Sequence, residues 1–148
     1  MSLTARTAAL LLMAACAEPR PVAIEYGVAA CDQCHMTITD PRFAAQLVTR
    51  TGKVFAFDDP ACLGAFVAAG RVPPSRVHSL WVNDFVTPES LIDATRAVYL
   101  RVPGINTPMG SHVIATTPGA RADSLRAALG GEPLRWEQVR ALPHGGER

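Results

Sequence analysis

The fold of this chain is decided by a short stretch, Val54-Phe55-Ala56-Phe57-Asp58-Asp59-Pro60. Its first four residues place two Phe side chains on one face and smaller apolar side chains on the other, as in a half-buried strand. The next three predict the start of a helix, because Asp is a favoured N-cap and Pro fits the first turn. The apolar run Ala61–Ala69 is then the predicted helix, and Gly70 ends it.

One predicted strand on each side completes a unit around this stretch. The apolar run Phe43–Val48 is a strand that the turn residues 51–53 connect to the quoted strand as a hairpin. After the helix, a loop over residues 71–76 contains two consecutive prolines and leads into the strand Val77–Val82. The predicted order is therefore strand, strand, helix, strand.

The same order of elements recurs in the second half of the chain. The predicted elements are strands at residues 97–102 and 112–116, a helix at 117–129 and a strand at 133–136. The pair Gly130-Gly131 ends the helix. Two such units in one short chain predict a duplicated α+β architecture of two tandem ββαβ modules.

We expect the first module to cover residues 31–83 and the second to cover residues 84–142. The segment between the two sets of elements contains a predicted helical turn at residues 88–94. The last residues, 143–148, are rich in Gly and charge and are predicted to be a disordered tail.

Residues 1–15 are typical of a lipoprotein signal peptide. Arg6 supplies a positive charge, and the apolar run after it is too short for a permanent membrane helix. The segment Met13-Ala14-Ala15-Cys16 resembles a bacterial lipobox, in which the Cys is lipidated; the alternative is cleavage elsewhere, with an incidental Cys16. Residues 16–30 are then a tether, and we expect a periplasmic protein that is lipid-anchored to a bacterial membrane.

The composition excludes several classes of function. The chain has 14 Lys and Arg against 13 Asp and Glu, and no run of basic residues, which argues against a nucleic-acid partner. No catalytic triad, carboxylate pair or Gly-rich phosphate loop is visible. We therefore expect a carrier and not an enzyme.

The candidate chemistry begins at Cys31-Asp32-Gln33-Cys34-His35-Met36, which places two thiols, an imidazole and a thioether within six residues. Thiolate and thioether are soft donors that select Cu(I). If Cys16 carries lipid, three thiols remain, because Cys62 is the only other Cys. A disulfide between two of them would leave one unpaired, so a metal that uses all three is the simpler account, with such a disulfide as the alternative.

Two further residues have open roles. Met109 lies between Pro108 and Gly110, in a bend that would present its thioether to a metal or plug a core equally well. Cys62 lies on the predicted apolar helix, where it is either a ligand or a small buried side chain.

Several motifs together resemble the NosL family, bacterial lipoproteins that are copper accessories of nitrous oxide reductase. These motifs are Cys31–Met36, Val54–Asp59 followed by Cys62, Ile92–Ala94 before Ala97–Tyr99, and Thr107–Gly110. The resemblance implies a two-module ββαβ fold, Cu(I) binding and delivery of copper in the periplasm. It also implies two partners, a membrane transporter complex and nitrous oxide reductase, the latter reached directly or through that complex.

The predicted ligands of Cu(I) are Cys31, Cys34, Met36 and Met109, with His35, Cys62 and His112 as further candidates. The family commonly has Gly where this chain has His35, so His35 either adds a ligand or changes the turn.

Two other classes of protein also use such cysteines. In a thiol–disulfide oxidoreductase the first Cys opens a helix, and the helix dipole lowers the pKa of its thiol. No helical run begins at Cys31. The acid that follows it, Asp32, tends to raise the thiol pKa instead. A zinc-stabilised structural module would use the three Cys and a His, and it leaves Met36 and Met109 without a role.

The lipobox predicts that Cys16→Ser abolishes lipid labelling of the chain and releases it from membranes. Metabolic labelling with a radioactive fatty acid, followed by membrane fractionation, measures both. Lipid labelling that persists in the variant would show that Cys16 is not the modified residue.

Overall fold

The computed structural model describes residues 18–143. The predicted signal peptide, Cys16 and residues 144–148 of the predicted tail lie outside the described residues. The elements are β1 (Ala45–Thr49), β2 (Val54–Phe57), α1 (Pro60–Ala68), the 3-10 helix η1 (Pro74–Arg76), β3 (Val77–Asn83), β4 (Leu91–Asp93), β5 (Val98–Arg101), β6 (Val113–Thr116), α2 (Ala120–Leu129), β7 (Glu132–Leu134) and α3 (Trp136–Arg140). Among the described helices, none has the length and apolar character to cross a bilayer.

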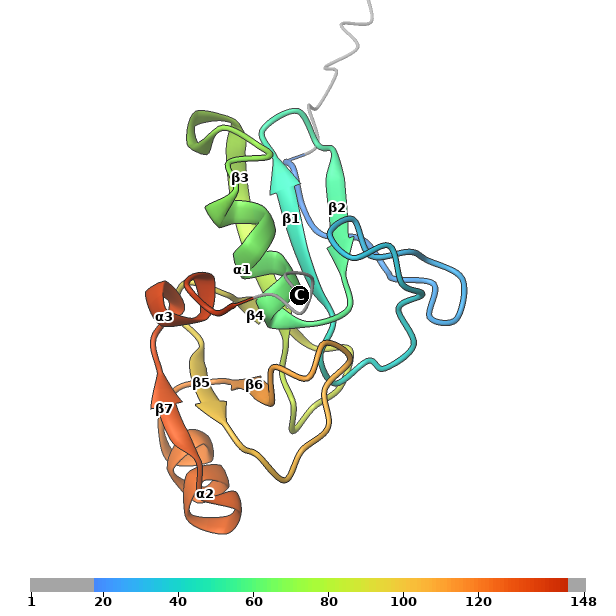
Figure 1. Ribbon diagram of the computed structural model, residues 1–148. Coiled ribbons are helices and arrows are strands. Elements are labelled where there is room, and N and C mark those ends of the chain that lie inside the picture. Colours follow the sequence, from blue (N-terminus) through green and yellow to red (C-terminus); the bar gives the residue numbers. More distant parts are fainter. Residues whose placement is uncertain (1–17, 144–148) are drawn as a thin grey trace, which may run out of the picture.

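The strands form two antiparallel sheets with the orders β2-β1-β3-β4 and β6-β5-β7 (Figure 1). In each sheet the first strand of a ββαβ unit, β1 or β5, lies between the other two strands of that unit. The strand that follows it lies on one side, and the strand after the helix lies on the other. The two halves therefore share one ββαβ topology, and the predicted α+β fold of two tandem modules is confirmed.

Two local predictions are wrong. Residues 91–93 form strand β4, which pairs with the edge of β3, and not part of a helical turn. Trp136 begins α3 and is not the end of the last strand. In both places tertiary contacts override local propensity: β3 offers an unpaired edge, and the Trp136 ring stacks on Tyr99 with centroids 6.1 Å apart.

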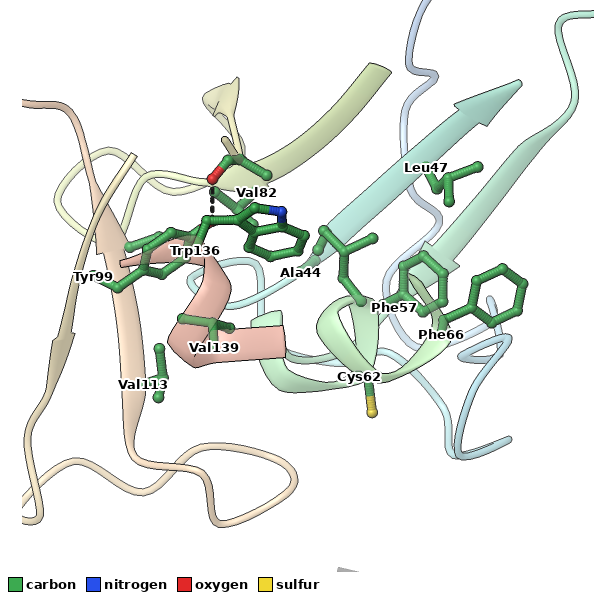
Figure 2. Close-up of a cluster of buried hydrophobic side chains, with 14 of the residues drawn as sticks. Ala44, Leu47, Phe57, Cys62, Phe66, Val82, Tyr99, Val113, Trp136 and Val139 are labelled. Atoms are coloured by element: carbon green, nitrogen blue, oxygen red, sulfur yellow. Dashed lines mark hydrogen bonds between the residues drawn. The ribbon is translucent and has the colours of Figure 1, made fainter. Parts of the chain in front are cut away.

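The larger of two core clusters joins both sheets and helices α1 and α3, and the smaller one contains Phe43, Leu100, Val102 and Ile114. Every residue of β1 is buried, and Phe66 of α1 packs against Phe57 of β2 with ring centroids 5.1 Å apart. Figure 2 shows Trp136 and Val139 of α3 within this cluster, near side chains of the second sheet. Burial of apolar side chains of this size contributes about 2 kcal/mol each, so α3 is a substantial part of the joint between modules.

The segment before β1 also packs on the first sheet. The backbone N–H of Val22 donates to the Gln46 side chain at 3.0 Å, and that side chain donates back to the Val22 carbonyl at 2.7 Å. The amide of Asn83 donates to the Tyr26 hydroxyl at 2.9 Å. Part of the predicted tether, from Val22 onward, is thus held against the sheet.

Gly64 allows α3 to cross α1 closely. A Cβ atom at this position would lie 2.9 Å from the Val139 carbonyl oxygen and 3.0 Å from the Arg140 Cα. Both are backbone atoms, which cannot move away cheaply. We expect Gly64→Ala to destabilise the protein by about 1–2 kcal/mol, since overpacking outweighs the gain in helix propensity.

Denaturant unfolding measures this effect. Gly104→Ala is the matched control, because Gly104 has open space around it. The control should change the free energy of unfolding by less than about 1 kcal/mol. If Gly64→Ala is as stable as this control, the close crossing of the two helices does not constrain the fold.

Candidate metal centre

The Cys31–Met36 motif forms a tight turn. Ala30 and Thr37 pair as an isolated antiparallel bridge at its base. Inside it, the Cys31 N–H donates to the Met36 carbonyl at 2.8 Å, and the His35 N–H donates to the Cys31 carbonyl at 2.9 Å. The backbone therefore folds the motif on itself, without a helix that begins at Cys31.

Asp32 attaches this turn to the edge strand β2. Its backbone N–H donates to the Ala56 carbonyl at 2.8 Å, and its carboxylate accepts from the Ala56 N–H at 2.8 Å. Since β2 leads directly into Asp58, these two bonds bring the motif beside the start of α1.

His35 has a φ of +65°, in the left-handed region that glycine favours. This conformation explains why Gly is common at this position in the family that the motif resembles. His35 keeps the turn, at a conformational cost of about 1 kcal/mol. Its side chain is exposed.

Asp59 caps α1, as predicted. It accepts the Ala61 N–H at 2.7 Å, and Pro60 is the first residue of the helix. At the other end Gly70 has a φ of +63° and follows the helix as predicted. Cys62 is the third residue of α1, so its thiol lies at the positive end of the helix dipole.

The ligand atoms of Cys31, Cys34, Asp58 and Cys62 all lie within 4.8 Å of one another. Cys31, Asp58 and Cys62 are buried, with exposures of 0%, 1% and 2%, whereas Cys34 is half-buried. None of the three thiols in the described part of the chain is in a disulfide. Figure 2 shows the Cys62 sulfur pointing away from Phe57 and Phe66.

Asp58 joins the three thiols although it was not a predicted ligand. One of its oxygens, Oδ2, accepts from the Cys34 thiol at 3.4 Å. The other, Oδ1, is buried and has no hydrogen-bond partner. An unpartnered carboxylate oxygen in the interior is unfavourable, and a cation among the thiols would satisfy it. The one sequence signal was the presence of two consecutive acids where a helix cap needs only one.

The three thiols titrate differently. The Cys62 thiol donates to Cys31, which lowers the pKa of Cys31 to about 7 against the opposing effect of burial. Burial raises the pKa of Cys34 to about 12, and the hydrogen bond to Cys31 raises the pKa of Cys62. Cys31 is therefore the first to become a thiolate, the form that binds a metal.

The second module contributes the loop that carries Met109. The Ser111 hydroxyl donates to both carboxylate oxygens of Asp59 at 3.0 Å, and the Met109 N–H donates to Asp59 at 3.4 Å. Burial raises the pKa of this carboxyl group. The loop is thus attached to the first turn of α1, and the half-buried Met109 packs against the core cluster that includes Cys31 and Cys62.

Among the described His, Cys, Asp and Glu residues, neither His35 nor His112 belongs to the four-residue group. Met36 is 51% exposed at the end of the motif turn. The His112 ring bonds through Nδ1 to the Ile105 carbonyl at 2.8 Å, within its own loop. His35, Met36, Met109 and His112 remain predicted ligands.

Three thiols and a carboxylate on a duplicated ββαβ scaffold define an α+β protein with a cysteine-rich candidate metal centre. The model of the NosL family matches residues 21–142, and the chain belongs to the NosL family. The chain is similar to a solved structure described as the crystal structure of the copper chaperone NosL from Shewanella denitrificans. The TM-score is 0.69 and the sequence identity 21%, over 82% of this chain and 96% of that one, which supports the fold. No curated protein matches this chain.

The left-handed backbone at His35 generates a prediction. His35→Gly should stabilise the protein by about 1 kcal/mol, because glycine adopts this conformation without steric cost. Thermal or denaturant unfolding measures it, and His78→Gly, in strand β3, is the control that should destabilise. A loss of stability in His35→Gly would mean that the His35 side chain contributes more than its backbone strain costs.

Proposed function

We propose that this protein is a periplasmic, lipid-anchored metallochaperone that carries Cu(I) for the assembly of nitrous oxide reductase. The observation that carries the proposal is the group of three free thiols, two of them buried, with the unpartnered Asp58 oxygen. Membership of the NosL family and the copper chaperone among similar structures support it.

The donor chemistry favours Cu(I). Thiolates and thioethers are soft ligands, and Cu(I) is the metal that they select. Cys31 and Cys34 supply thiolates, and Met36 and Met109 supply thioethers, with Cys62 as a third thiol in reach of the first two. The attachment of the Met109 loop to Asp59 supports a site to which both modules contribute.

The gradient of exposure suits a carrier. Cys31 and Cys62 are buried, while Cys34 is half-buried and Met36 is exposed. Ligands of a partner can therefore reach the metal first from the Cys34 and Met36 side and displace these two residues before the buried thiols. The proposed partners are a membrane transporter complex and, directly or through it, nitrous oxide reductase. The protein moves a metal and catalyses no reaction.

Asp58 favours one other candidate, a zinc-stabilised structural module. Three Cys and one carboxylate make four ligands, the number that a structural zinc site takes. In that case the Met residues have no function in metal binding. The two candidates therefore differ in the metal that binds more tightly and in the effect of Met109.

Competition with a chromogenic chelator measures the affinity of the reduced protein for Cu(I), and a parallel titration measures Zn(II). We expect preference for Cu(I) and a loss of Cu(I) affinity of more than about tenfold in Met109→Leu, since even partners outside the ligand shell contribute that much. Leu keeps the volume, so the free energy of unfolding should barely change. Cys34→Ser should lose more Cu(I) affinity than Met109→Leu.

Each variant has a result that contradicts part of the proposal. If Met109→Leu binds Cu(I) as tightly as the unaltered chain, Met109 is a core residue and the site belongs to one module. If Cys34→Ser also binds as tightly, the copper function fails. Preference for Zn(II), with no effect of Met109→Leu, identifies the structural zinc module.

A further inference from the structure

The fold gathers four cations that are dispersed along the sequence. Arg50 and Lys53 come from the β1–β2 hairpin, and Arg71 and Arg76 come from the segment after α1. Together they line a cavity of about 320 Å³ that has no acidic residue in its wall. None of the four forms an ion pair with a residue in 18–143, where the ion pairs involve other arginines. We call these four residues the basic end.

Contacts between the two segments hold the basic end together. The Arg50 N–H donates to the Arg76 carbonyl at 2.9 Å, and the Arg50 guanidinium donates to the Ser75 carbonyl at 2.9 Å. The Lys53 ammonium lies over the Phe55 ring, 4.4 Å from its centroid. Four exposed cations around a cavity whose wall contains no acidic residue create a positive potential that attracts anions.

The described chain begins at this same end. Residues 18–20 share a cavity wall with His78 and Trp81, and His78 is two residues after Arg76. Figure 1 shows the start of the described chain beside the β1–β2 hairpin. Cys16 precedes Glu18 by two residues, which span at most about 7 Å.

The candidate metal centre lies at the opposite end of the first module. Asp58 follows Lys53 by five residues along the extended strand β2, which corresponds to about 15 Å. Cys62 lies in the first turn of α1, whereas Arg71 follows the last turn. A surface that contacts the basic end therefore leaves the thiols free.

We propose that the basic end docks on the headgroup phosphates of anionic phospholipids. This inference rests on the lipid anchor in the proposed function. An anchor at Cys16 would hold the basic end at the bilayer surface, where its local concentration relative to the headgroups is high. Each cation near an anionic surface strengthens binding about fivefold. The docked protein presents its thiols away from the membrane, toward partners in the periplasm.

Lys53 is the single lysine of the chain, and it belongs to the basic end. A reagent specific for lysine therefore reports on the basic end alone. The lipidated full chain is reconstituted on vesicles of phosphatidylcholine alone or mixed equally with phosphatidylglycerol. An amine-reactive reagent then labels Lys53, and mass spectrometry of the peptide gives its rate. We expect labelling at least about fivefold slower on the anionic vesicles. High salt should remove the difference, because at 1 M the Debye length is only about 3 Å.

The matched control moves the lysine and keeps the charge. Lys53→Arg combined with Arg126→Lys places the lysine on α2, which Figure 1 shows far from the β1–β2 hairpin. That lysine should be labelled equally on both kinds of vesicle. Arg71→Gln in the otherwise unaltered chain should speed Lys53 labelling on anionic vesicles, with unchanged Cu(I) affinity.

The outcomes separate this inference from the proposed function. Equal labelling of Lys53 on both kinds of vesicle overturns the docking and leaves the anchor and the metal centre intact. Equal protection of the control lysine also overturns it, because the effect is then not local to the basic end. A chain that does not float with neutral vesicles lacks the anchor, and the docking fails with it.

Discussion

The rest of the site depends on the hydrogen bonds that the Asp59 carboxylate accepts. It caps α1 through the Ala61 N–H and binds the loop of the second module through Ser111 and the Met109 N–H. One buried group thus fixes both the helix start that carries Cys62 and the loop that carries Met109. These hydrogen bonds add directional contacts between the modules to the apolar packing of the core, which is not directional.

Two adjacent acids have opposite roles because their surroundings differ. Both oxygens of Asp59 accept hydrogen bonds from other residues of the chain, so this carboxylate has its hydrogen-bond partners within the protein. Asp58, one residue earlier, keeps one buried oxygen without a partner and contacts the Cys34 thiol with the other. The first acid organises the scaffold, and the second leaves a demand for positive charge at the thiols.

The formal net charge is only +1, but the charged groups are unevenly distributed over the molecule. The thiols and Asp58 gather at one end of α1, while Arg50, Lys53, Arg71 and Arg76 gather beyond the other. β2 and α1 separate these two groups and keep them in fixed relation. This arrangement suits the proposed function, in which the protein is held at one end and exchanges its metal at the other.

The sequence by itself determined the local elements. Alternation of apolar residues, the cap at Asp59 and the glycine at position 70 act within a few residues of the chain, so they predicted both ββαβ units. The tertiary structure decided β4, the helical start at Trp136 and the association of Cys62 and Asp58 with the motif turn. It also created the basic end. These features depend on contacts between residues far apart in the sequence, which no local pattern encodes.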